Sequence, residues 1–62
     1  MKVEIIIEVT NTGYSAYSDK YAAYTTGTTL EELKVNMLEA MNLYFEKEGK
    51  IIFVEDLSFK HK

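Results

Sequence analysis

Apolar and polar residues alternate along the first segment of the chain, residues 2–10, KVEIIIEVT. The residues that share one face are Val3, Ile5, Ile7 and Val9. Those of the other face are Lys2, Glu4, Ile6 and Glu8. A period of two among β-branched residues is typical of a strand with one buried face. Residues 2–10 are therefore predicted to form the first strand.

The next segments predict a β-hairpin and a third, short strand. Asn11-Thr12-Gly13 favours a three-residue hairpin connection, because glycine adopts the left-handed conformation that such a loop needs. Residues 14–18, YSAYS, then form the second strand, and residues 22–26 form the third after a turn at Asp19-Lys20. In the expected register Thr10 lies opposite Tyr14, Ile7 faces Tyr17 on the core side, and Glu8 and Ala16 share the outer side. A slip of one residue would exchange the two faces.

A helix is predicted from Leu30 to about Glu48. Thr29 is placed to cap it by accepting a hydrogen bond from the Glu32 amide, and the Glu32 side chain is expected to return to the Thr29 amide. Gly49 is predicted to end the helix in a left-handed conformation. At 100° per residue the apolar side chains gather in one arc, from which Val35 and Leu43 are excluded. The arc contains Leu30, Leu33, Met37, Leu38, Ala40, Met41, Tyr44 and Phe45.

The last strand is predicted at residues 50–57, KIIFVEDL, which are apolar on both faces, and residues 58–62 are expected to form a tail. One helix covers one face of a sheet, so the expected fold class is a two-layer α+β sandwich of β-β-β-α-β order. A right-handed crossover gives the sheet order 3-2-1-4, with the fourth strand parallel to the first. The chain is predicted to form a single domain, residues 1–62, with an ordered core at about 2–57. This arrangement leaves one face of the sheet uncovered.

Size and charge restrict the classes of partner. The 62 residues include no cysteine, so neither a disulfide nor a thiolate metal site is expected. So small a core favours a homodimer or a higher oligomer as a source of stability. The formal charge of −3 favours basic partners over nucleic-acid backbones. Neither a signal peptide nor a membrane-spanning segment is expected, and a cytoplasmic location is predicted.

Catalytic residues are not expected. Glu4 and Glu8 lie four residues apart on one strand, too far from each other to hold one metal ion, so neither a metal nor a cofactor is predicted. His61 lies next to the end of the chain, where a general base would lack a fixed position. Ser15 and Ser18 have no histidine in a neighbouring element to activate them. The chain is therefore interpreted as a non-enzymatic protein.

The tyrosines at positions 14, 17, 21 and 24 leave two interpretations open, since their rings are suited either to the small core or to a protein interface. Base stacking would need cationic neighbours, and only Lys20 is close in sequence. An apolar edge strand is also expected to attract another chain. The residues expected at a partner interface are Glu4, Ile6 and Glu8 on the uncovered sheet face, Tyr14 and Tyr17 as anchors, and Ile52 and Val54 at the edge.

Several motifs together resemble the HicB-like antitoxin family of bacterial toxin–antitoxin systems. They are VEIIIEV at 3–9, GYSAY at 13–17, Asp19, and TTGTTLEEL at 25–33. The family commonly begins its helix with Thr-x-Gly-x-Thr-x-Glu-Glu-Ala. The residues that match this pattern are Thr25, Gly27, Thr29, Glu31 and Glu32. The chain departs from the family at residues 20–22, where Lys-Tyr-Ala replaces Leu-Pro-Gly, and residues 1–62 are not expected to contain the C-terminal DNA-binding domain of many members.

The resemblance implies a partial ribonuclease-H-like fold. It also implies that the chain occludes a small basic, RNA-cleaving toxin of HicA type. Two alternatives stay open: an orphan dimeric module without a toxin, and a small nucleic-acid-binding domain.

Overall fold

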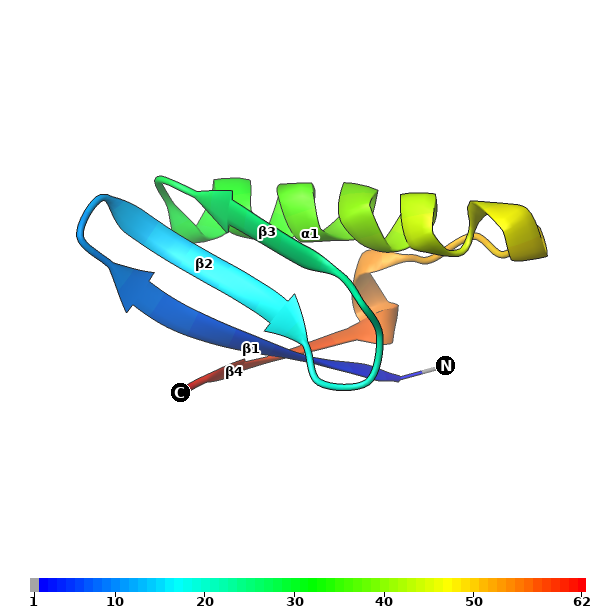
Figure 1. Ribbon diagram of the computed structural model, residues 1–62, viewed down its shortest axis with the longest axis horizontal. Coiled ribbons are helices and arrows are strands. Elements are labelled where there is room, and N and C mark those ends of the chain that lie inside the picture. The colour runs from blue at the N-terminus through cyan, green and yellow to red at the C-terminus, as the bar shows by residue number, and fades with distance from the viewer. Residues whose placement is uncertain (1) are drawn as a thin grey trace.

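The computed structural model describes residues 2–62 and contains one helix packed on one face of a four-stranded sheet (Figure 1). The strands are β1 (Val3–Thr10), β2 (Gly13–Ser18), β3 (Tyr24–Gly27) and β4 (Leu57–His61), and the helix is α1 (Leu30–Tyr44). The sheet order is β3-β2-β1-β4. β1 and β2 are antiparallel, β2 and β3 are antiparallel, and β4 is parallel to β1. The predicted α+β class and sheet order are confirmed.

The β1–β2 hairpin has a register one residue away from the predicted one. Thr10 lies opposite Gly13, so the connection is the two residues Asn11 and Thr12. Consequently Ile7 faces Ala16, and both are buried, whereas Tyr17 faces Ile6 on the other side of the sheet. The expected pairing of Ile7 with Tyr17 is therefore wrong, and the faces of β2 are exchanged.

Gly13 pairs with Thr10 as the first residue of β2, and another part of the backbone lies against it. A Cβ atom at this position would lie 2.5 Å from the carbonyl oxygen of Gly27 and 2.9 Å from the Cα of Thr28. No side chain fits in that space. The glycine therefore allows the backbone of Gly27 and Thr28, at the end of β3 and before α1, to lie directly against β2. Local turn patterns do not reveal this long-range requirement.

The start of α1 follows the predicted cap with one change. The Thr29 hydroxyl accepts a hydrogen bond from the Glu32 amide at 3.0 Å, and Thr29 has extended backbone angles. The Glu32 carboxylate does not return to the Thr29 amide. It accepts hydrogen bonds from the amide of Thr28, at 2.8 Å, and from the Thr28 hydroxyl, at 3.2 Å. This contact ties the linker after β3 to the first turn of the helix.

The C-terminal end of the helix is followed by a 3-10 turn. α1 ends at Tyr44, and a 3-10 turn, η1 (Glu46–Glu48), leads to Gly49, which has a left-handed φ of 69°. Tyr21, from the loop between β2 and β3, packs its ring edge-on against Phe45 with centroids 5.0 Å apart. Tyr44 meets both rings in the same manner. These three aromatic rings close this end of the core.

The core lies between α1 and the sheet. The largest fully buried side chains are Val3, Ile5 and Ile7 of β1 and Leu33, Met37 and Met41 of α1. Val35 and Leu43, predicted outside the apolar arc, are 54 % and 70 % exposed. The one-sided burial of both elements explains why the sheet keeps a face that the helix does not cover.

The predicted last strand at residues 50–57 is wrong. Residues 50–53 belong to no strand, Val54–Asp56 form a 3-10 turn, η2, and β4 runs from Leu57 into the expected tail. Figure 1 shows the reason: α1 and η1 extend past the end of the sheet, and the chain must return beside the helix before it reaches the start of β1. The apolar run is used for that return.

Asn42 holds the returning segment against α1. Its side-chain oxygen accepts a hydrogen bond from the Ile52 amide at 2.8 Å, and its side-chain nitrogen donates to the Ile52 carbonyl at 3.1 Å. The same nitrogen donates to the Leu38 carbonyl at 3.1 Å. One asparagine thereby replaces a strand partner for Ile52, whose side chain is 3 % exposed.

Candidate protein-binding surface

The sheet face opposite α1, here called the open face, is formed by alternate residues of the four strands. The registers place on it Glu4, Ile6 and Glu8 of β1, Ser15 and Tyr17 of β2, Tyr24 and Thr26 of β3, and Ser58 and Lys60 of β4. Figure 1 shows the helix on the other side of the sheet only. This surface is therefore available to another molecule.

One row of side chains crosses the middle of the open face. Tyr24 pairs with Tyr17, Tyr17 pairs with Ile6, and Ile6 pairs with Lys60, so the four residues stand side by side on neighbouring strands. Tyr24 is 66 % exposed, while Tyr17 and Ile6 are half-buried by their neighbours. Two phenol rings beside an aliphatic side chain form an amphipathic strip of the kind enriched at protein interfaces.

Ion pairs lie beside this row. The Lys60 ammonium is 3.2 Å from a carboxylate oxygen of Glu4, and the Lys62 ammonium is 3.1 Å from one of Glu8. Each pair links β1 to β4 or to the residue that follows it. The two glutamates, expected to meet solvent or a basic partner, are thus already matched by lysines of the same chain.

Lys62 has a raised pKa. The main cause is the hydrogen bond between its ammonium and Glu8, followed by the charge of Glu8 and then that of Tyr17, all of which favour the protonated lysine. The cation is therefore fixed at neutral pH, and the open face carries balanced charges rather than an acidic field.

The structure brings together four of the seven predicted interface residues. Glu4, Ile6, Glu8 and Tyr17 share the open face. The other three lie elsewhere: Tyr14 is on the helix side of β2, half-buried against the core; Ile52 is buried; and Val54 is in η2, 56 % exposed. These three residues lie elsewhere because the hairpin register and the last strand differ from the prediction.

The two interpretations of the tyrosines divide between the two faces. Tyr14 and Tyr21 pack against the core, whereas Tyr17 and Tyr24 lie on the open face. Tyr24 and Lys60 are not among the seven predicted interface residues. Tyr17 and Tyr24 pair on neighbouring strands and flank a tight loop in which the Ser18 amide donates to the Ala23 carbonyl, a contact between strands that the sequence pattern does not reveal.

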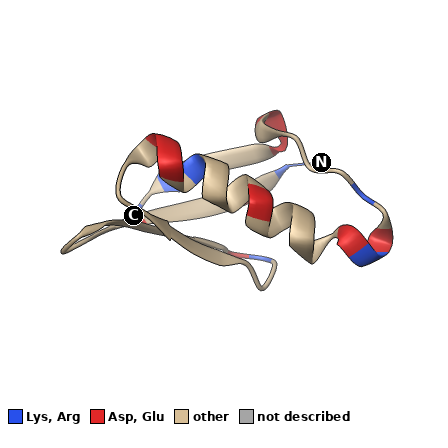
Figure 2. Ribbon diagram, turned by 90° about the horizontal axis from the view of Figure 1, so that it is seen from above, with Lys and Arg blue, Asp and Glu red and all other residues tan. Residues whose placement is uncertain are grey.

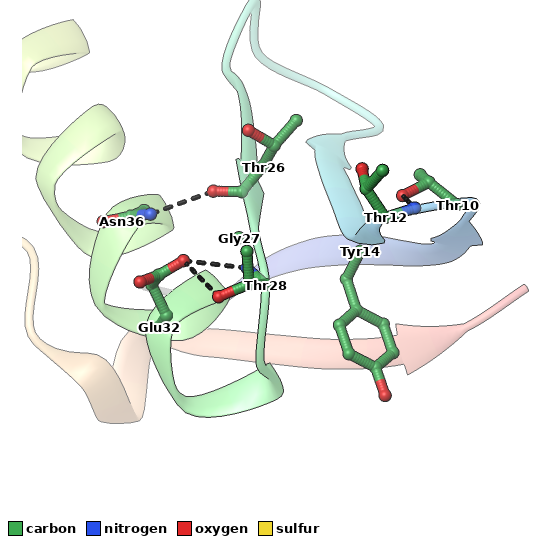
Figure 3. Close-up of a pocket in the computed structure, with 8 residues that line it drawn as sticks. All are labelled: Thr10, Thr12, Tyr14, Thr26, Gly27, Thr28, Glu32 and Asn36. Carbon is green, nitrogen blue, oxygen red and sulfur yellow. Dashed lines mark hydrogen bonds between the residues drawn. The ribbon is translucent and has the colours of Figure 1, made fainter.

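A polar hollow of about 450 Å³ lies between the β1–β2 turn and the start of α1 (Figure 3). It is lined by Thr10, Thr12, Tyr14, Thr26, Gly27, Thr28, Glu32 and Asn36. Its polar groups are mostly engaged within the protein, because Glu32 binds Thr28 and the Asn36 amide donates to the Thr26 carbonyl at 2.9 Å. The hollow is thus part of the joint between β3 and α1.

Five of the eight remaining acidic residues lie in α1 and η1. Figure 2 shows acidic positions at the start, middle and end of the helix and its 3-10 extension, with few basic positions between them. They are Glu31, Glu32, Glu39, Glu46 and Glu48. The negative charge of the chain is concentrated on the helix layer, away from the open face.

Within residues 2–62, no group of three or more histidine, cysteine or acidic side chains is arranged to hold a metal ion. His61 lies at the end of β4 and is exposed. No helix in this part of the chain is long and apolar enough to cross a membrane. No protein-family model, curated protein or solved structure matches the chain.

Proposed function

We propose that this chain is a non-enzymatic, protein-binding domain that uses the open face to occlude a small basic toxin of HicA type. The observation that carries the proposal is the uncovered row of Tyr24, Tyr17 and Ile6 across three strands. Aromatic residues with adaptable hydroxyl groups supply contact area at a small entropic cost, which suits a surface for another protein.

The charge distribution supports a basic protein as the partner. The lysines near the row are matched by Glu4 and Glu8, so docking there does not bring unpaired cations together. The net charge of −3 on the whole chain provides a long-range attraction that increases the rate of encounter with a basic partner. The resemblance of residues 3–33 to HicB-like antitoxins supplies the class of that partner.

The first test measures binding of a catalytically inactive HicA-type toxin by isothermal titration calorimetry. Tyr24→Ala is expected to weaken binding by about thirtyfold, because a hot-spot aromatic residue contributes about 2 kcal/mol. The matched control is Val35→Ala, which removes an exposed apolar side chain from the outer side of α1. Equal losses in both variants, or intact binding by Tyr24→Ala, would contradict the use of the open face.

A second candidate function is binding of single-stranded nucleic acid. It is favoured by one observation: β4 and the residue after it bring Lys60 and Lys62 to the face that carries two tyrosines. The double substitution Glu4→Lys and Glu8→Lys releases both lysines and separates the two functions. For a toxin-binding domain it abolishes toxin binding, whereas for a nucleic-acid-binding domain it strengthens RNA affinity in a fluorescence anisotropy titration.

A further inference from the structure

The outer edge of β4 carries main-chain groups that point away from the sheet. The Lys62 amide donates to the Ile7 carbonyl at 2.9 Å, so the main-chain groups of Lys62 point toward β1. Main-chain groups alternate between the two edges of a strand, and those of Lys60 and Ser58 therefore also point toward β1. The amides and carbonyls of Phe59 and His61 face outward, where the described chain places no further strand.

We propose that β4 pairs with β4 of a second copy, antiparallel about a two-fold axis, with Phe59 opposite Phe59 of the partner. In this register the two phenylalanines exchange both main-chain hydrogen bonds. Leu57 then lies opposite His61 of the partner subunit, and Ser58 lies opposite Lys60 of the partner subunit. The same patch meets itself, as a closed two-fold dimer requires.

Charge repulsion and strand length favour this register over the two registers that are shifted along the strand. A shift that places Phe59 opposite the partner's His61 brings Lys60 against the partner's Lys60 on the same face, which is unfavourable. A shift in the other direction pairs only residues 57–59 and loses half of the strand. The chosen register sets Lys60 against a serine hydroxyl instead, while Glu4 offsets its charge at 3.2 Å. The lysine therefore does not protect this edge as an unpaired edge lysine would.

Phe59 gives the contact an apolar centre. It lies on the helix side of β4 and is half-buried, with the Lys34 ammonium 5.4 Å from the centre of its ring. α1 packs mainly over β3 and β2, so the helix layer is displaced away from β4. A second copy at this edge would bury Phe59 against its symmetry mate, in a gap that the single helix leaves.

The opposite edge does not offer the same contact. At β3 the Thr26 carbonyl already accepts a hydrogen bond from Asn36, and α1 packs directly against the strand. The proposed dimer is thus specific to β4. A two-fold axis perpendicular to the sheet keeps both helices on one side and joins the two open faces into one surface. The dimer is independent of the proposed function, because its test contains no toxin.

The experiment measures the mass of the full chain by analytical ultracentrifugation across a wide range of concentrations. The expected species has twice the 7.2 kDa mass of the chain. Ser58→Lys places like charges opposite each other twice, and it is expected to raise the dissociation constant by about tenfold or more. The control is Thr26→Lys, the same change on the open face of the other edge strand. Circular dichroism verifies that each variant is folded.

Three outcomes overturn the proposal: a wild-type monomer at all concentrations, a dimer that Ser58→Lys leaves intact, or an equal effect of Thr26→Lys. The register has a separate test, since the chain contains no native cysteine. Ser58→Cys and Lys60→Cys chains, mixed and oxidised, are expected to form the mixed disulfide, because directly opposite residues lie within disulfide reach. The mixture of Ser58→Cys and Thr26→Cys chains is the control, and equal yields from both mixtures would refute the register.

Discussion

The two edge strands of this sheet occupy equivalent positions but are secured in different ways. β3 is followed at once by α1, which packs on it, binds its Thr26 carbonyl through Asn36 and approaches the backbone of Gly27. β4 is held by its pairing with β1 and by exposed ion pairs. The difference indicates that an edge can be closed by local chain connectivity, whereas the edge formed by a distant segment stays open to a partner.

The largest expected effect comes from Gly27→Ala, which disturbs the contact between the edge strand β3 and α1. A Cβ atom there would lie 2.7 Å from the Leu33 nitrogen and 2.9 Å from the Leu33 Cα, and neither backbone atom is able to move aside. The substitution should destabilise the fold by about 3 kcal/mol, the upper end for overpacking, as measured by urea unfolding.

Gly49→Ala is the matched control for this change. Gly49 has a left-handed φ of 69°, but its missing Cβ faces open space. Only the conformational cost applies, about 1 kcal/mol. If the two alanine variants lost the same stability, the close contact between β3 and α1 would not be what secures that edge.

The next largest effects are the stability losses expected when either asparagine of α1 is replaced by alanine. Asn42→Ala removes two hydrogen bonds to the segment that leads to β4 and a third to the Leu38 carbonyl within α1, and about 1–3 kcal/mol of stability should be lost. Asn36→Ala removes one bond to β3 and should cost about 0.5–1.5 kcal/mol. Amide hydrogen exchange localises each loss: the Ile52 amide should exchange faster only in Asn42→Ala. Faster exchange of that amide in both variants would show that the edges are not independently secured.

The smallest expected effect is the loss of the ion pair between Lys62 and Glu8 at alkaline pH. The pKa of Lys62 is raised in the folded state, so its pair with Glu8 stabilises the fold fully below pH 10.5 and loses that contribution as the pH rises through the folded value. NMR titration of the Lys62 side chain measures the shift. Glu8→Gln should return the lysine to its ordinary pKa, and an unchanged titration would exclude Glu8 as the cause.

Features set by neighbouring residues were predictable from the sequence. The alternation in residues 2–10 and the Thr29 cap depend on contacts within a few positions, and both are present in the structure. The sheet order followed from the handedness of the crossover and from the single apolar arc of the helix.

Features set by distant backbone were not predictable in the same way. Gly13 is predicted in the turn, but it is the first residue of β2 and lies against the backbone of Gly27, and the observed register places Tyr17 on the open face. Residues 50–53 have the composition of a strand, but Asn42 pairs with Ile52 instead. Local propensity does not distinguish an extended segment on a helix from a strand in a sheet. The open face therefore gained Lys60 and lost Tyr14.

The pairing of β1 with β4 joins the two ends of the chain, which gives it the longest loop closure in the molecule. The hairpin, β3 and α1 assemble from contacts between neighbours, so they form before that closure is complete. During this interval the flank of β1 is itself an unpaired template, and at high concentration the final strand of another molecule competes for it. Slow refolding and exchange of C-terminal segments between molecules are the kinetic consequences of placing the last strand beside the first.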